Sequence, residues 1–513
     1  MSSRLRNVAT ITVSCLAQLM VAIDMTVLHL AVPALTTQLG ASSEELLWIA
    51  DVYGFAMGGL LVTMGNLGDR FGRRRVLVIG ITAFAVGSLL AAAAPTVWAL
   101  IGARALLGVA GAAVLPSTSS LLRAVFTTQR ARTAAVGAGA GVSAAGFAIG
   151  PIVGGVLLEH FWWGSVFLVN VPVSALILLA ARFVPESRSG RRLRLDPLSI
   201  GLSIVGVVAV VYGIKGAFYA GLWYPEVLGA FVLGAGCLLG FARRQRVLDE
   251  PLIDLDLFRR RGFSASVGSN LISVFTMSAF ALITSQYLQL VLRWSTLRSG
   301  LAFVPGAMAA LIAGGVLAAK AVGRFGRAKA VSGGLALAAL GFALFGLVQT
   351  DTSYALVLTA QVAFGAGAAL TLTVTGDTIL GTVPRDRAGA AAAISSTAYE
   401  LGGSLGIAVV GSVLSAVYQA ELVLPDGVSP VLADQVRESF SATAAVAEGL
   451  PEPVASAVRA AAEQSFVGGI RVSMLGSAVV MVVLSVVALR SLRRVPKVIE
   501  NPMDDPRPVE TPK

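Results

Sequence analysis

Residues 46–95 read LLWIADVYGFAMGGLLVTMGNLGDRFGRRRVLVIGITAFAVGSLLAAAAP. Two apolar runs, 46–67 and 76–95, flank a short segment that carries Asp69, Arg70 and three further arginines. Each run reaches the length of about 20 residues that an α-helix needs to cross the hydrocarbon core of a bilayer. Transmembrane β-strands are about half as long and alternate in polarity, which these runs do not. The stretch therefore predicts two membrane helices joined by a basic turn.

The composition of the whole chain supports a membrane protein. Of 513 residues, 56% are hydrophobic and 13% are charged, against about 25% charged residues in ordinary globular proteins. So few charged side chains cannot cover a water-facing surface, which excludes a soluble enzyme, a disordered chain and collagen. The net charge is 39 − 28 = +11, but Lys and Arg form short clusters between apolar runs. That pattern indicates membrane topology and not a nucleic-acid partner.

The sequence offers no set of residues for metal binding or catalysis. Cys15 and Cys237 both lie inside apolar runs, so the chain has neither a disulfide framework nor a metal-ligand spacing. No combination of nucleophile and base stands out. We therefore expect a protein that is not an enzyme and that holds no metal and no cofactor.

Fourteen apolar runs follow one another along the chain, and they predict an all-α protein with 14 transmembrane helices in the lipid bilayer. The runs are 8–33, 46–67, 76–95, 97–122, 134–158, 164–184, 198–217, 225–242, 263–292, 300–322, 330–348, 354–380, 389–419 and 466–492. Most Lys and Arg residues fall at alternate connections, which predicts that both termini are cytoplasmic. The outer loop 420–465 is acidic and favours a solvated cap with two short amphipathic helices, at 431–447 and 453–463.

Ionisable residues inside the membrane are costly, so each is a candidate for function. At a rise of about 1.5 Å per residue, Asp24, Asp51 and Arg104 lie at a similar depth in three different helices. A buried Arg near two carboxylates keeps them ionised until a proton or a substrate arrives. We interpret these residues as a proton and cation site. The alternative is a static ion pair that holds the three helices together.

A second candidate lies in the run 389–419, where Glu400 is close to the middle of the membrane beside Tyr399. It favours a proton-coupling or substrate role over a silent neutral acid. Asp377 falls near the cytoplasmic end of its run, where an interfacial position is the favoured interpretation and a functional role is the alternative. His29 lies near the outer interface and is interpreted as an interfacial polar residue, with proton handling as the alternative.

The turn between the first two quoted runs contains Gly65, Asp69, Arg70, Gly72 and Arg73. Glycine permits a sharp turn and close approach of helices. Asp69 is suited to accept hydrogen bonds from a helix N-terminus or to pair with arginine. The combination of Gly, Asp and Arg is more specific than an arginine cluster alone.

This turn resembles the signature loop of the major facilitator superfamily. Five further segments resemble motifs of the family as a whole (Arg104–Gly111), of its antiporters (Gly146–Gly155) or of its fourteen-helix drug/proton antiporter branch (the other three). They are Ala22–Leu28 with Pro33, Leu47–Tyr53, Arg104–Gly111 with its glycines Gly108 and Gly111, Gly146–Gly155, and Ala398–Gly402. The similarity is greatest to exporters of quaternary ammonium compounds, methyl viologen and cationic dyes. The second copy of the signature loop is reduced to Lys320–Arg327.

The resemblance implies two six-helix bundles around a central cavity, separated by two inserted helices. The implied division is an N-terminal bundle at 1–190, inserted helices at 191–262, and a C-terminal bundle with the outer loop at 263–495. The Pro-rich and charged composition of 496–513 itself predicts a disordered cytoplasmic tail. It implies substrate or proton binding by Asp24 and Glu400, and proton coupling by Arg104. The implied conformational residues are Gly65, Asp69, Arg70, Gly72 and Arg73 at an inner gate, and Gly146, Gly150, Pro151, Gly154 and Gly155 in a helix that bends and packs.

The leading hypothesis from these features is a proton-coupled multidrug exporter in the bacterial cytoplasmic membrane. Its substrates are expected to be small hydrophobic or cationic compounds, exported by alternating access with the proton gradient as energy source. Trp48, Tyr53 and Tyr399 are candidates for cation–π contact with a substrate. We expect a monomer. The alternatives are a dedicated exporter of one antibiotic or endogenous metabolite, and a membrane sensor or scaffold.

Overall fold

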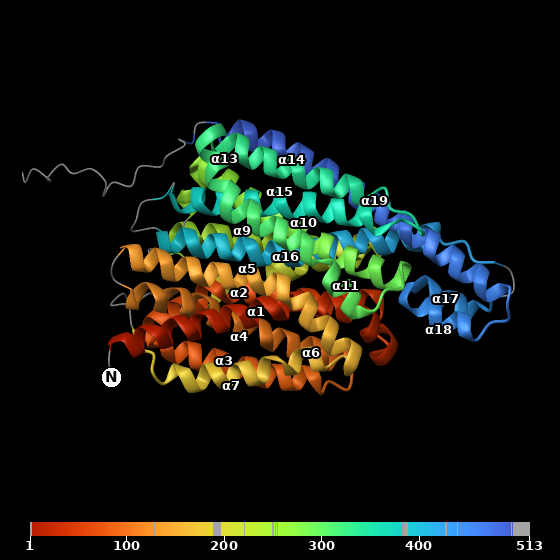
Figure 1. Ribbon diagram of the computed structural model, residues 1–513, viewed down its shortest axis with the longest axis horizontal. Coiled ribbons are helices and arrows are strands. Elements are labelled where there is room, and N and C mark those ends of the chain that lie inside the picture. Colours follow the sequence, from red (N-terminus) through yellow and green to blue (C-terminus); the bar gives the residue numbers. More distant parts are fainter. Residues whose placement is uncertain are drawn as a thin grey trace, which may run out of the picture.

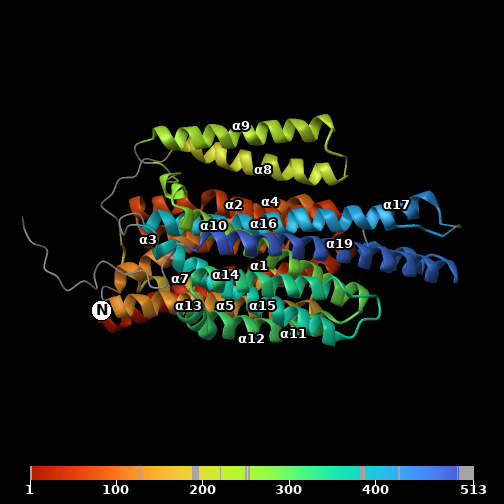
Figure 2. The same cartoon turned by 90° about the horizontal axis from the view of Figure 1, so that it is seen from above.

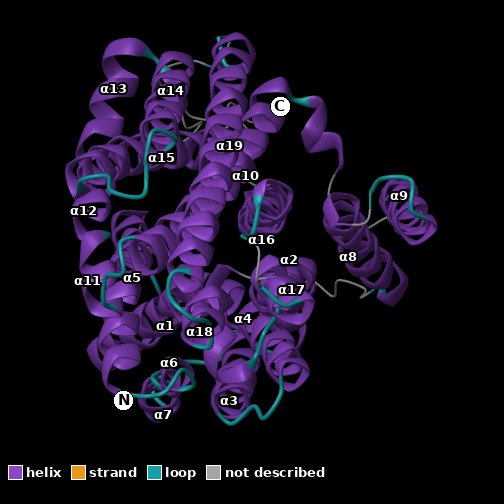
Figure 3. Ribbon diagram, turned by 90° about the vertical axis from the view of Figure 1, so that its right-hand side faces the viewer, coloured by secondary structure: helices purple, strands orange, loops and turns teal. Residues whose placement is uncertain are grey.

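The computed structural model describes residues 3–126, 129–187, 196–219, 221–248, 251, 253, 255–381, 383, 388–425, 428–438, 440–493 and 495. In this part of the chain all regular secondary structure is helical (Figure 3). The α-helices are α1 (Ser3–Leu39), α2 (Ser43–Phe71), α3 (Arg73–Ala92), α4 (Val97–Val125), α5 (Gln129–His160), α6 (Ser165–Leu168), α7 (Asn170–Ala181), α8 (Pro197–Tyr219), α9 (Pro225–Val247), α10 (Arg261–Gln286), α11 (Thr296–Ala302), α12 (Val304–Ile312), α13 (Ala318–Phe325), α14 (Arg327–Phe345), α15 (Tyr354–Gly381), α16 (Ala388–Glu421), α17 (Pro430–Glu438), α18 (Thr443–Glu448) and α19 (Val454–Ser491). The 3₁₀-helices are η1 (Leu255–Arg259) and η5 (Phe440–Ala442), and the π-helical turns are η2 (Tyr287–Val291) and η3 (Ala313–Leu317).

Long apolar helices dominate the described chain, as the sequence predicted. Eleven of its helical segments are long and apolar enough to cross a membrane. Three shorter apolar segments run over Leu30–Leu39, Ile149–His160 and Ser165–Ala181. The prediction of an all-helical membrane protein is therefore confirmed. The protein crosses the membrane several times.

The helices pack as two groups that face each other across a seam (Figure 1). Helices α1–α7 pack on one another, chiefly through the pairs α2/α4, α1/α5 and α3/α4. In the second group the main pairs are α14/α15, α10/α16 and α14/α19. The seam between the groups is formed by α2 against α16, α5 against α11 and α1 against α10. Helices α8 and α9 form a hairpin on the outside, with α8 against both α2 and α16 (Figure 2).

Glycine permits the close packing inside the first group. A Cβ at Gly108 of α4 would overlap the backbone carbonyl of Tyr53 on α2, and a Cβ at Gly150 of α5 would overlap the side chain of Thr26 on α1. Without side chains at these positions the backbones approach closely, which replaces the hydrophobic driving force that is missing between helices in lipid. The packing fixes α1, α2, α4 and α5 relative to one another.

The two ends of the molecule differ. Helix α1 begins and α19 ends at the same end, which we call the terminus end (Figure 1). The opposite end, the cap end, carries α17, η5 and α18. The segment 453–463, expected as a separate short helix, is instead the first part of α19, because its helical pattern continues without a break into the apolar run 466–492. Residues 431–447 form α17, η5 and α18 where one amphipathic helix was expected.

Candidate functional site

Asp24 on α1 and Arg104 on α4 form a fully buried ion pair. Arg104 Nη1 donates to Asp24 Oδ2 at 2.7 Å, and Arg104 Nε donates to the carbonyl of Ile49 on α2 at 3.2 Å. The exposed fractions of the two charged residues are 0% and 1%. A buried charge is tolerated only when it is paired and hydrogen-bonded, and this pair meets both conditions. The sequence placed these two residues at a similar depth, and the structure brings them into contact.

Asn170, which was not among the candidate residues predicted from the sequence, completes this charged cluster. Its Nδ2 donates to Asp24 Oδ1 at 3.0 Å and lies 3.2 Å from Ser88 Oγ on α3. Asn170 is 1% exposed at the start of α7. The only signal in the sequence is an amide within an apolar run, which carries no charge and therefore did not stand out. The carboxylate of Asp24 is held at both oxygens by two different helices.

Tyr53 of α2 lies over the charged cluster. The Cζ atom of Arg104 is 4.3 Å from the centre of the Tyr53 ring and 5.9 Å from that of Phe167. One face of the Tyr53 ring is therefore occupied by a cation of the protein itself. The Tyr53 hydroxyl is buried without a hydrogen-bond partner in the described chain, and it lies within electrostatic range of both Asp24 and Glu400.

Glu400 of α16 lies on the other side of the seam, against α2. It is 4% exposed, and a Cβ at Gly58 of α2 would be 3.3 Å from Glu400 Cβ. Among the described residues Glu400 Oε2 has no hydrogen-bond partner. Tyr399 precedes it and is half-buried. The absence of a side chain at Gly58 lets Glu400 approach α2 closely. Glu400 is thus buried in the second group of helices, and Asp24 in the first.

Asp51 is also fully buried, but it lies on a different face of α2 from Tyr53. Leu47, Asp51, Gly54 and Gly58 recur at helical spacing on one face. Leu47 and Gly54 on this face contact Gly411 and Ser404 of α16. The hydrogen bonds from the Arg104 side chain go to Asp24 and to the Ile49 carbonyl. Asp51 therefore shares the face of α2 that packs against α16, and its grouping with Asp24 and Arg104 stays a prediction.

Trp48 points away from the charged cluster. Its ring centre is 6.4 Å from that of Tyr212 on the inserted helix α8, and its Nε1 donates to Glu44 at 3.4 Å. It packs with Phe55, Val211 and Ala408 where α8 covers the α2–α16 seam. The sequence could not show this, because the packing partner of α2 on that face is a helix far along the chain.

The turn between α2 and α3 is formed at a glycine, as expected for a sharp turn. Gly72 has φ +114°, a conformation that a residue with a side chain rarely adopts. Arg73 Nη1 donates to the carbonyl of Ser120 at 3.3 Å and to Ser187 Oγ at 3.4 Å. Glu186, which sequence reasoning missed, accepts from the backbone N–H of Arg74 at 3.0 Å. Gly65 packs at the Pro116 ring of α4, and Arg70 is exposed.

The second copy of this turn contains a buried arginine that forms an ion pair. Arg327, at the start of α14, is 6% exposed and contacts Asp377 Oδ2 of α15 at 2.6 Å. Arg327 Nη1 also donates to Thr378 Oγ1 at 2.9 Å. Asp377 itself is exposed, in agreement with an interfacial position. The side chains of Asp69 and His29 lie outside the described residues.

The glycine-rich segment of α5 faces two partners. Gly146, Gly150 and Gly154 face α1, while Pro151 and Gly155 face α11 in the other group of helices. A Cβ at Gly155 would be 2.8 Å from Leu297 Cα. The segment therefore forms part of the seam near the cap end, where Glu159 accepts from the backbone N–H of Leu297 at 3.1 Å.

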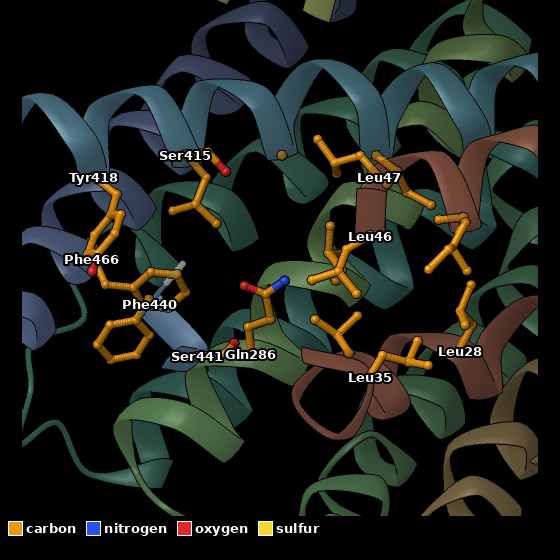
Figure 4. A pocket seen from close by; sticks show the side chains of 17 residues that line it. Leu28, Leu35, Leu46, Leu47, Gln286, Ser415, Tyr418, Phe440, Ser441 and Phe466 are labelled. Atoms are coloured by element: carbon orange, nitrogen blue, oxygen red, sulfur yellow. The ribbon is translucent and has the colours of Figure 1, made fainter. Parts of the chain in front are cut away.

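A pocket opens between the two groups on the cap side of the buried acids (Figure 4). Its walls come from α1, α2, α10, α16, α19 and η5. Leucines from α1 and α2 line one side, and Tyr418, Phe440 and Phe466 line the other. No cluster of metal-ligating side chains occurs in the described part of the chain.

Comparison with known proteins gives consistent matches along the chain. The family profile described as the Major Facilitator Superfamily matches residues 14–407. The chain is 40% identical to the multidrug efflux pump LfrA of Mycolicibacterium smegmatis over 485 residues, which cover 94% of this chain and 96% of LfrA. It is 40% identical to the methyl viologen resistance protein SmvA of Salmonella typhimurium over 376 residues, 71% of this chain and 74% of SmvA.

The fold is shared with solved transporters. A bacterial homologue of the human lysosomal transporter Spinster, in an inward-facing and unoccupied conformation, superposes with a TM-score of 0.66. The superposition covers 96% of this chain and 98% of that one, at 15% sequence identity.

Proposed function

Because the chain belongs to the Major Facilitator Superfamily, we propose that it is a proton-coupled exporter of small hydrophobic compounds, with cations preferred. It is a multi-pass protein of the cytoplasmic membrane. Two relatives at 40% identity are named as a multidrug efflux pump and a methyl viologen resistance protein. Those names support export of varied compounds, including cations.

One observation carries the proposal: each group of helices buries a carboxyl group close to the seam. Asp24 is held by Arg104 and Asn170, whereas Glu400 Oε2 has no hydrogen-bond partner in the described chain. A buried carboxyl group with one oxygen unpartnered is costly as an anion, so it gains from accepting a proton or a cationic substrate. Proton and drug then compete for the same group, which is the requirement for exchange.

The proposed transport cycle uses rocking of the two groups about the seam. With the terminus end open, a cationic substrate enters and pairs with Glu400. A proton that arrives from the cap end neutralises the carboxyl group and releases the substrate on that side. The ion pair of Asp24 and Arg104 holds a fixed charge next to Tyr53, so the N-terminal group keeps its shape while Glu400 changes partner. We propose no cofactor, since the proton gradient supplies the energy.

The finer architecture is part of the proposal. We propose fourteen spans with cytoplasmic termini, so that the terminus end is inner and the cap end is outer. The proposed bundles are 1–190 and 263–495, with the hairpin of 191–262 inserted between them. Asp69, Arg70 and Arg73 would form the inner gate. The ion pair of Arg327 with Asp377 supports a second inner contact in the C-terminal bundle. We propose that the monomer is the transporting unit.

Uptake of ethidium into inverted membrane vesicles tests the function. Vesicles with the protein should accumulate the dye when the vesicle interior is made acidic relative to the medium. A protonophore should abolish this accumulation. Vesicles without the protein are the control. Gradient-independent binding would instead favour a scaffold. Resistance profiling across cationic, neutral and anionic compounds separates a multidrug exporter from a dedicated exporter, because only the latter gives a narrow spectrum.

A further inference from the structure

The cap-side pocket lies on the path from the buried acids to the cap end. Leu28 is one helical turn beyond Asp24 on α1, and Ala50 is next to Asp51 on α2. Ile407 and Gly411 follow Glu400 by about two and three turns along α16. Phe440 and Ser441 of η5 close the far side. The pocket therefore lies between the acids and the cap end.

The walls of the pocket belong to both groups of helices. Residues of α1 and α2 face residues of α10, α16 and α19 across it. In the described structure the pocket is narrow, with a volume of about 60 Å³, whereas a drug-sized ligand needs about 300 Å³ or more. Because its opposite walls are on groups that move relative to each other in alternating access, the pocket must widen when the cap end opens.

The chemistry of the walls differs from that of the acid sites. None of the described residues that line the pocket is Asp, Glu, Lys or Arg. The hydrogen-bonding groups include Gln286 and the hydroxyls of Ser415 and Ser441, while the hydroxyl of Tyr418 already donates to the Val436 carbonyl at 2.7 Å. A cation finds no counter-charge among these residues, so the pocket is suited to the apolar body of a ligand and not to its charge.

Gln286 occupies the centre of this pocket. Figure 4 shows its side-chain amide between the leucines of α1 and α2 and the aromatic rings of Tyr418, Phe440 and Phe466. The residue is the last of α10, immediately before the π-helical turn η2. The amide offers two donors and one acceptor. By contrast, the side-chain amide of Gln289 in η2 donates to Ser285 Oγ of α10 at 2.9 Å.

We propose that this pocket is an exit subsite, which binds the hydrophobic body of the substrate after it has left Glu400, and that Gln286 determines which substrates pass. The inference rests on the proposed function. A neutral amide lets a cation leave, whereas a carboxylate at the same place would hold it. The transport rate of uncharged substrates would change little when a carboxylate replaces the amide.

The test is the paired substitution Gln286→Glu and Gln289→Glu in inverted vesicles, with ethidium as cationic probe and Nile red as neutral probe. Gln286→Glu should slow ethidium transport about tenfold, the effect of one charge-assisted contact, and change Nile red transport by less than about twofold. Gln289→Glu should change neither. If the two substitutions changed the rate of ethidium transport equally, the proposed exit subsite would be refuted.

A second measurement decides the matter if Gln286→Glu does not reach the membrane. In a chain with Cys15→Ser and Cys237→Ser, the substitution Ser415→Cys places a thiol in the pocket wall. Ethidium in excess should slow the labelling of this thiol by a small maleimide several-fold. Unchanged labelling during active transport would overturn the proposal. If the wild type shows no proton-driven ethidium transport, the proposed function itself is refuted, which is a separate result.

Discussion

Asn170 of α7 donates its side-chain amide to Oδ1 of Asp24 at 3.0 Å, while Arg104 holds Oδ2 of the same carboxylate. Together they tie α1, α4 and α7 around one buried negative charge. Glu400 across the seam lacks such a partner at Oε2 in the described chain. The two acids therefore differ in what they are free to do. Asp24 is suited to a constant charge, and Glu400 to exchange of a proton for a substrate.

The first prediction concerns Asn170. Asn170→Ala should lower the rate of ethidium efflux about tenfold, since a hydrogen bond to a charged group contributes about 1.5–3 kcal/mol. The matched control is Ser174→Ala, one turn further along α7, where the buried hydroxyl donates among the described residues only to the Met20 sulfur at 3.3 Å, a weak contact. Efflux at the wild-type rate in Asn170→Ala would show that Asp24 needs no support from α7.

The ion pair of Asp24 and Arg104 should behave as a unit in stability. Asp24→Asn and Arg104→Gln should each destabilise the protein by about 3–5 kcal/mol, because each leaves a buried group without its partner. The double variant should cost less than the sum of the two, and it should still be inactive in transport. Thermal unfolding in detergent measures all three variants. Additive losses would mean that the two residues do not interact in the folded protein.

The α5–α11 contact should control access from the cap end. A Cβ at Gly300 would overlap the Pro151 carbonyl, so Gly300→Ala should push the two groups apart there. Labelling of a cysteine at Ser415 from the cap side should become faster by several-fold. Gly102→Ala is the control, because nothing lies within 4 Å of a Cβ at that position. No change in labelling by Gly300→Ala would show that this contact does not close the cap end.

The ion pair at the base of the inserted hairpin should stabilise the folded protein down to moderately acidic pH. Arg244 donates to Asp196 Oδ1 at 2.8 Å and holds the pKa of that carboxyl well below its usual range. A lowered pKa stabilises the folded protein above the unfolded-state value of about 4, and this contribution is lost as the pH falls below it. Asp196→Asn should therefore lower the unfolding temperature equally at pH 7 and pH 5. The deficit should shrink below about pH 4. A deficit that disappears already at pH 5 would contradict this assignment.

The helices were accessible to sequence reasoning because each apolar run is continuous. The contact of Asp24 with Arg104 was also accessible, because both are charges at a similar depth and few charges occur in the spans. Which helix packs against each face of another helix could not be predicted from the sequence. Trp48 meets Tyr212 of α8, which lies far along the chain, and Gly54 of α2 meets Ser404 of α16. Such contacts depend on how the two groups and the hairpin pack, which no local pattern encodes.

Uncharged polar residues of the candidate site were also not predicted from the sequence. Asn170 and Gln286 each lie within or at the end of an apolar run, and neither alters hydropathy enough to stand out. Their importance follows only from what surrounds them: a carboxylate in one case and a pocket in the other. Glu186 was missed for the opposite reason, since it lies among many charges outside the spans.

Proton movement coupled to substrate is the most direct test of the account. In inverted vesicles that hold an acid interior, addition of ethidium should release protons in the wild type and in Glu421→Gln, an acid at the cap end of the same helix α16. In Glu400→Gln, ethidium should release none above the level of vesicles without the protein. Proton release at the wild-type rate in Glu400→Gln would contradict the claim that this carboxyl group exchanges protons for substrate.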